Sequence, residues 1–212
     1  MLTPTTRHGL LALLLATLTG LTGTTAAQTS RPVEADPTEI IGGLAPARLS
    51  PRYLLMNGKG RAVTSEDFRE RFQLVAFGFT GCPDVCPTTM LEMQQVMASL
   101  GERASQVQPI FITVDPERDT AQVLDAYTRN FDARILGLTG SPALVRRAAD
   151  SFKIQFEKVQ EPGASANVYT MDHTAGLFLL GPDGQLLAKF GYGVPVTEIV
   201  SRIEQWMKAD GQ

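Results

Sequence analysis

Residues 73–87 read QLVAFGFTGCPDVCP, and this stretch constrains the fold more than any other part of the chain. Its first half, residues 73–80, is a nearly continuous apolar run, which is typical of a central strand buried on both faces of a sheet. A proline suits the first turn of a helix, because the missing N–H would have no partner there. The sequence therefore predicts a strand, a loop that carries Cys82 and Cys86, and a helix that starts at Pro87.

The helix after the cysteine loop carries an apolar stripe. Met90, Met93, Met97 and Leu100 recur at spacings of three and four residues, which places them on one face of a helix. Methionine sulfur can bind copper, but a stripe at helical spacing is typical of side chains packed in a core. We therefore predict that these methionines stabilise the fold and take no part in the function.

Predicted strands and helices alternate along the rest of the chain. Residues 53–63 are expected to form a hairpin, because the Asn57-Gly58 dipeptide favours a tight β-turn. Further strands are predicted at 108–115, 135–139, 174–180 and 185–190, and helices at 120–131, 141–152 and 196–208. This order indicates an α/β fold, a thioredoxin-like mixed sheet flanked by helices with an N-terminal β-hairpin.

Three polar side chains stand where helix caps are expected. Ser65, Asp119 and Ser141 precede predicted helices, and their oxygens can accept hydrogen bonds from N–H groups of the first turn. The segment TVDPERDT at 113–120 follows the second buried strand, and Arg118 within it is expected to pair with a carboxylate near the cysteine loop. We interpret this segment as structural rather than catalytic.

The N-terminal segment is predicted to be an export signal. Residues 10–21 are apolar apart from two threonines and a glycine, and residues 25–27 have the small side chains that a signal peptidase accepts. We predict a signal peptide over residues 1–27, with a membrane anchor as the alternative, then a flexible linker at 28–47 and a thioredoxin-like domain at 48–212. Either way the domain is exported, to the periplasm in solution or anchored at the outer face of the inner membrane.

The composition of the chain excludes some functions and leaves few residues that could bind a metal. The chain has 212 residues, a formal net charge of −3 and no run of Lys or Arg, so a nucleic-acid surface is not expected. It contains two cysteines and two histidines. Because His8 falls in the predicted signal peptide, the mature chain keeps only Cys82, Cys86 and His173. A cysteine pair in an exported protein is usually a structural disulfide, and this interpretation stays open.

His173 is expected to face the cysteine loop. If the strand at 174–180 pairs antiparallel with the strand at 73–80, its start lies beside the end from which the loop leaves. Two thiolates and one imidazole suit Cu(I), and Cu(II) with an added oxygen ligand, whereas structural zinc usually has four protein ligands. Asp84 or Asp172 can supply that oxygen or orient the imidazole. The alternative is a histidine that is satisfied within the fold.

Three segments together resemble the Sco/SenC family of copper chaperones: GFTGCPDVCP at 78–87, TVDPERDT at 113–120 and YTMDHT at 169–174. The resemblance runs from about residue 42 to the C-terminus. It implies a thioredoxin-like fold in an exported or membrane-anchored domain. It also implies that copper is bound by Cys82, Cys86 and His173.

The same resemblance implies a role in assembling cytochrome c oxidase. Family members are thought to deliver copper to the binuclear site of oxidase subunit II, or to reduce the cysteines of that site. The implied partners are oxidase subunit II or its assembly factors, and an upstream copper donor. The resemblance favours a metallochaperone over an enzyme. Two features depart from the family: Gly81 is often a larger residue, and many relatives keep a clearer transmembrane helix.

Thiol chemistry offers the main alternative function. A thiol–disulfide oxidoreductase or a redox sensor would use Cys82 and Cys86 to exchange disulfides with a partner. Three residues separate these cysteines, whereas dithiol oxidoreductases of the thioredoxin kind have two between theirs. A peroxiredoxin needs Thr or Ser three residues before its reactive cysteine, and the chain has Phe79 and Pro83 at those positions, so the sequence argues against that class.

Overall fold

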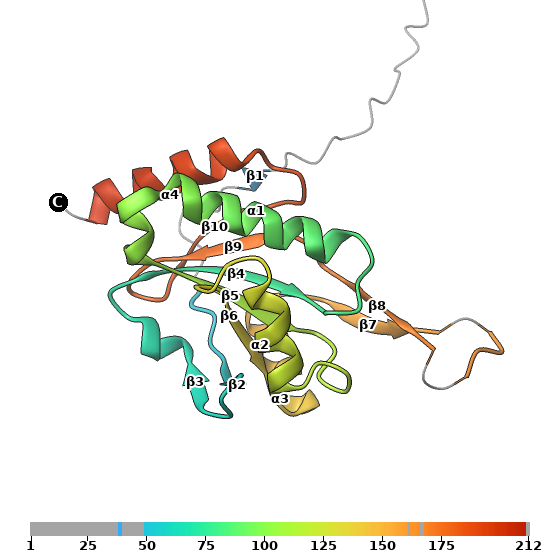
Figure 1. Ribbon diagram of the computed structural model, residues 1–212. Coiled ribbons are helices and arrows are strands. Elements are labelled where there is room, and N and C mark those ends of the chain that lie inside the picture. The colour runs from blue at the N-terminus through green and yellow to red at the C-terminus, as the bar shows by residue number, and fades with distance from the viewer. Residues whose placement is uncertain (1–37, 40–48, 161, 166–167, 211–212) are drawn as a thin grey trace, which may run out of the picture. The chain divides into compact units, whose positions relative to one another are not determined.

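The computed structural model describes residues 38–39, 49–160, 162–165 and 168–210 (Figure 1). The signal peptide or anchor predicted over 1–27 lies outside these residues. So does the predicted linker at 28–47, apart from the backbone of β1 (Thr38–Glu39). In the part of the chain that is described, no helix is both long and apolar enough to cross a membrane.

The sheet is built around β4 (Phe72–Gly78), the strand predicted from the apolar run, and all seven of its residues are buried. β4 pairs in parallel with β5 (Val107–Thr113) on one side and antiparallel with β9 (Leu177–Leu180) on the other. The antiparallel pairing with β9 confirms the topology on which the expected place of His173 depends.

Further strands extend the sheet on both sides. In the described residues its order is β1-β10-β9-β4-β5-β6-β2-β3, in which β4, β5 and β6 run parallel. The additional strands are β2 (Leu54–Asn57), β3 (Ala62–Thr64), β6 (Leu136–Thr139) and β10 (Leu186–Phe190). β2 and β3 form the predicted N-terminal hairpin. The mixed sheet confirms the predicted fold class.

Helices cover both faces of the sheet (Figure 1). They are α1 (Val85–Ser99), α2 (Ala121–Arg129), α3 (Pro142–Ser151) and α4 (Val196–Asp210), with short 3-10 helices η1 (Ser65–Phe68) and η2 (Gly101–Gln106). Because successive side chains of a strand face opposite sides, Leu74 and Ala76 of β4 join the core beneath α1 and α4. Val75 and Phe77 join the core beneath α3.

The methionine stripe of α1 lies in the core, as predicted. Met90, Met93 and Met97 are at most 1% exposed and belong to the same cluster as Ile199 and Ile203 of α4. Flexible methionine side chains fill the space between the two helices and the sheet. Their spacing along the sequence is thus explained by packing.

A two-stranded ribbon, which the sequence does not predict, carries His173. It consists of β7 (Phe156–Val159) and β8 (Thr170–His173), paired antiparallel and separate from the main sheet (Figure 1). Its side chains are mostly exposed or half-buried. Phe156 and Met171 pack against the core, but two apolar residues do not make a recognisable alternating pattern in the sequence.

The strand predicted at 174–180 begins only at Leu177, because the chain turns just before it. Gly176 has φ of +123°, a backbone conformation that side chains with a Cβ rarely adopt. A Cβ at this position would lie 2.3 Å from the carbonyl oxygen of Phe190. The turn separates the ribbon from β9, so His173 belongs to the ribbon and not to the central sheet.

One predicted helix cap is confirmed and one is displaced by a residue. Ser141 caps α3, and its hydroxyl oxygen accepts a hydrogen bond from the Leu144 N–H at 3.3 Å. Ser65 does not cap η1, because it lies buried within the first turn. Thr64 occupies the cap position, and its N–H donates to the Asp67 carboxylate at 2.7 Å.

Candidate metal centre

Cys82 and Cys86 lie where β4 leads into the N-terminus of α1. The helix begins at Val85 and not at Pro87, because proline is tolerated throughout the first turn, where N–H groups lack helical partners. Cys86 is therefore the second residue of the helix. Cys82 is partly exposed whereas Cys86 is 2% exposed, and both are free thiols. The site presents one sulfur to solvent and holds the other inside.

The inner sulfur fits because β4 ends in glycine. A Cβ at Gly78 would lie 2.7 Å from the Sγ atom of Cys86 and 2.8 Å from the ring of Phe111. Neither neighbour can retreat, since Phe111 is fully buried in the core. Gly78 thus provides the space that the Cys86 thiol occupies.

The two thiols differ in acidity as well as in exposure. Burial opposes ionisation of Cys82, but hydrogen bonds from the backbone N–H groups of Asp84, Cys86 and Val85 outweigh it, and the pKa of Cys82 falls below its usual value. Burial raises the pKa of Cys86 to about 12. At neutral pH Cys82 is therefore the more reactive thiol. Cys86 loses its proton only when a cation or an electrophile binds to its sulfur.

We predict that iodoacetamide modifies Cys82 about ten times faster than Cys86 in the reduced native protein, because alkylation requires an accessible thiolate. Peptide mapping by mass spectrometry after short exposures measures the two rates. In concentrated urea the rates should converge, since the helix terminus and the burial are both lost. Equal rates in the native protein would contradict the assigned asymmetry.

His173 ends β8 and faces the inner cysteine. Its Nε2 atom lies 3.6 Å from the Sγ atom of Cys86, and its Nδ1 atom lies 3.1 Å from the carbonyl oxygen of Thr174. A carbonyl oxygen can only accept, so Nδ1 carries the proton and the lone pair of a neutral imidazole is on Nε2. The ring also meets Phe79 edge to face, with 6.1 Å between centroids. The structure thus directs the free nitrogen toward the cysteines.

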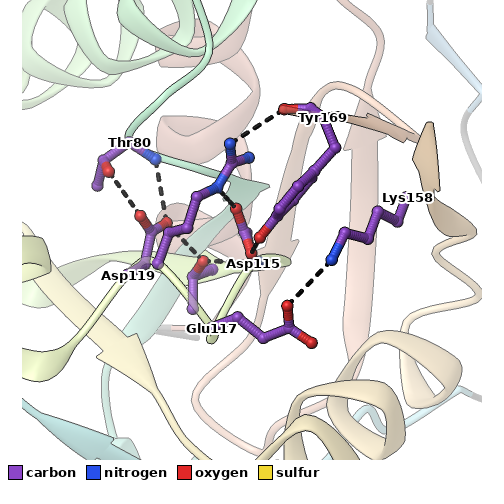
Figure 2. Close-up of polar contacts among 8 residues, drawn as sticks. Thr80, Asp115, Glu117, Asp119, Lys158 and Tyr169 are labelled. Carbon is purple, nitrogen blue, oxygen red and sulfur yellow. Dashed lines mark hydrogen bonds and ion pairs between the residues drawn. The ribbon is translucent and has the colours of Figure 1, made fainter. Parts of the chain in front are cut away.

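Asp119 fixes the start of the cysteine loop, a role that its predicted position as a helix cap does not reveal. Thr120 caps α2 instead, accepting the N–H of Val123 at 3.3 Å. The carboxylate of Asp119 accepts hydrogen bonds from the Thr80 N–H at 3.0 Å and the Thr80 hydroxyl at 2.5 Å (Figure 2). It also accepts the Thr113 hydroxyl at 2.6 Å. A buried carboxylate therefore holds the residue two positions before Cys82 against the end of β5.

The two candidate oxygen ligands, Asp84 and Asp172, are not held in position at the site. Asp84 precedes α1 and its side chain makes no capping hydrogen bond, while Asp172 is exposed on the ribbon. The carbonyl oxygen of Thr174 orients His173, the role that the sequence offers to Asp172. Within the described residues, no group of three or more His, Cys, Asp and Glu side chains is already gathered around one point. The donors adjoin one another but do not form a closed shell.

The imidazole is reachable from solvent. His173 lines an open hollow of about 570 Å³ between the ribbon and α3, together with Arg146, Asp150 and Asp172. With Cys82 partly exposed at the end of β4, the donor set has an open side. Two sulfurs and one imidazole nitrogen can bind a soft metal ion there, and an incoming thiolate can approach it.

Comparison with known proteins gives a consistent result. The family model described as SCO1/SenC matches residues 42–208. The mitochondrial protein SCO2 homolog of Homo sapiens is 36% identical over 159 residues, which cover 74% of this chain and 59% of that protein. The chain thus spans about three fifths of the length of that relative.

Solved structures of Sco proteins are similar to this chain. The copper-bound structure of Bradyrhizobium japonicum ScoI is 34% identical with a TM-score of 0.67, and the match covers 74% of this chain and 98% of that one. BsSco, described as having a disulfide switch and as a member of the Sco family of cytochrome c oxidase assembly proteins, is 25% identical with a TM-score of 0.57. That match covers 76% of this chain and 95% of BsSco.

Proposed function

Because this chain belongs to the SCO1/SenC family, we propose that it binds one copper ion through Cys82, Cys86 and His173 and passes it to a partner protein. The observation that carries the proposal is the 3.6 Å approach of the His173 Nε2 atom to the Cys86 sulfur, beside a second thiol on the same helix terminus. Soft sulfur donors select Cu(I), and the imidazole extends the site to Cu(II).

The asymmetry of the thiols supports transfer rather than storage. Cys86 is the buried ligand, whereas Cys82 and His173 are both partly exposed. A thiolate of a partner can replace Cys82 first, forming a shared intermediate in which copper keeps its coordination number. The copper then leaves as the partner's ligands displace Cys86 and His173 in turn. Exchange by stages avoids release of a free copper ion.

The proposed recipient is the binuclear copper site of cytochrome c oxidase subunit II, reached directly or through assembly factors of the oxidase. The support is the family membership and the description of BsSco as an oxidase assembly protein. An upstream donor would load the site. We place the protein in the periplasm or at the outer face of the inner membrane, on the evidence of the apolar segment at residues 10–21.

The test is copper capture by the reduced full-length chain. We expect one Cu(I) per chain, held against a competing chelator and transferred to a reduced peptide that carries the cysteine pair of the oxidase site. Failure to hold copper, together with a readily reversible Cys82–Cys86 disulfide, would replace the proposal with thiol–disulfide exchange.

Thiol–disulfide exchange is the alternative function, because the two cysteines have properties that such exchange requires. An accessible thiol of lowered pKa beside a buried thiol is an arrangement that can attack a disulfide and then resolve the mixed intermediate. Exchange of this kind needs no third donor, however. The orientation of His173 toward Cys86 favours copper binding over exchange.

A further inference from the structure

Arg118 lies where three separate parts of the chain meet. It belongs to the turn between β5 and α2 and forms an ion pair with the carboxylate of Asp115. Its Nη1–H donates to the backbone carbonyl of Tyr169 at 3.0 Å, just before β8. Its guanidinium stacks on the Tyr169 ring at 3.8 Å and lies 5.7 Å from the ring of Phe79, three residues before Cys82.

Tyr169 also contacts Asp115 of the turn after β5 and Lys158 of β7. Its hydroxyl donates to the Asp115 carboxylate at 2.9 Å, and burial together with this hydrogen bond raises its pKa to about 12. The ammonium group of Lys158 on β7 lies 3.8 Å from the centre of the same ring and pairs with Glu117 at 3.2 Å (Figure 2). Both strands of the ribbon are thereby tied to the turn after β5.

The ribbon is also attached to the core beneath α3, where Phe156 and Met171 pack and where Arg146 donates to the Phe156 carbonyl at 3.1 Å. The contacts of Arg118 matter because they join the ribbon to the turn after β5. β7 and β8 pair with each other and, in the described residues, do not join the eight-stranded sheet. Asp115, by contrast, is 3% exposed and rests on the end of β5, where its N–H donates to Thr113. A buried carboxylate keeps its charged partner firmly, since losing it leaves an uncompensated charge. Arg118 thus joins the residue before β8 to the end of β5.

We propose that Arg118 is a positioning residue for His173: it holds the β7–β8 ribbon so that the imidazole faces Cys86, and thereby decides whether copper receives its nitrogen ligand. The inference rests on the proposed copper site. Arg118 is not among the proposed copper ligands and acts through the ribbon. Because two thiolates alone suit Cu(I), the effect of losing Arg118 falls mainly on Cu(II), which depends more on the imidazole.

The first test needs no copper. Amide hydrogen exchange is measured in the full-length reduced protein for wild type, Arg118→Gln and the matched control Arg129→Gln. The control removes an arginine whose ion pair with Asp125 lies within α2. We expect exchange about tenfold faster in β7 and β8 of Arg118→Gln, with β4 and β9 unchanged, because a charge-assisted contact is lost. The control should match wild type. Unchanged ribbon exchange overturns the proposal.

Two further variants keep the test decisive if Arg118→Gln unfolds because Asp115 is left unpaired. Asp115→Asn/Arg118→Gln removes the stranded charge, and Tyr169→Phe removes only one hydroxyl from the contact. Both should accelerate exchange in the ribbon alone, with the smaller increase in Tyr169→Phe. An increase spread over the whole sheet in these variants would show that the contacts stabilise the fold as a whole, and no increase would show that they do not hold the ribbon; either outcome overturns the proposal.

The second test uses copper. Arg118→Gln should lower affinity for Cu(II) about tenfold while leaving affinity for Cu(I) within about threefold of wild type. Arg118→Lys keeps the charge but not the forked geometry, so it should recover only part of the loss. Equal losses for both oxidation states would contradict a role through His173. If wild type binds no copper, the proposed function fails, and hydrogen exchange still decides the role of Arg118.

Discussion

Replacing Cys82 or Cys86 with serine is expected to reduce the affinity for Cu(I) by about 10³-fold, the largest effect of any single change in this chain. A serine hydroxyl is a hard donor that stays protonated at neutral pH, so each replacement removes one of two soft ligands. A chelator competition in an anaerobic buffer measures the loss. Thermal unfolding should show that Cys82→Ser remains close to wild type, because this side chain is partly exposed.

The histidine should behave differently from the cysteines. His173→Ala leaves both sulfurs in place, so Cu(I) should weaken by about tenfold and Cu(II) by about 100-fold. Met93→Leu is a suitable control, because Met93 is fully buried and a methionine copper site would respond to this change. Wild-type affinity in His173→Ala, or weakened copper binding in Met93→Leu, would contradict the assigned ligands.

How much of this could be predicted from the sequence depends on how far apart the interacting residues lie. β4 and β5 are recognisable because nearly all of their side chains are buried, and a nearly continuous apolar run in the sequence reflects this burial. The turn at Gly176 is different: glycine is required there because the carbonyl oxygen of Phe190, fourteen residues later, leaves no space for a Cβ. Sequence spacing does not record such a contact, so the strand predicted at 174–180 begins three residues before β9 does.

The site shows the same limit. Cys82, Cys86 and His173 are proposed as ligands because such residues are scarce in the chain. The pairing of β4 with β9 brings His173 within 3.6 Å of the Cys86 sulfur, although the sequence does not predict the ribbon that carries it. The sequence predicts Asp119 as a helix cap, since it lies one residue before the helix predicted at 120–131. Its actual partner is Thr80, thirty-nine residues earlier. A carboxylate before a helix has the same local signature in both roles.

Asp119→Ala is expected to destabilise the protein by about 3–4 kcal/mol, because three donors lose their acceptor in the interior. The side chain is 1% exposed and accepts the N–H and hydroxyl of Thr80 and the hydroxyl of Thr113. Urea unfolding followed by circular dichroism measures the change. Asp125→Ala, which removes a half-exposed carboxylate from α2, should change stability by less than about 1 kcal/mol.

A milder replacement separates the stability effect from the effect on the site. Asp119→Asn keeps the shape of the side chain but turns an NH₂ group toward donors that need an acceptor, so the Thr80 end of the cysteine loop should loosen while the fold persists. Because Thr80 stands two residues before Cys82, we expect copper affinity to fall about tenfold in the folded protein. A contrary result is a loss of stability in Asp119→Asn while its copper affinity stays at the wild-type level. That result would show that Asp119 stabilises only the sheet, and that the first turn of α1 fixes the conformation of the cysteine loop.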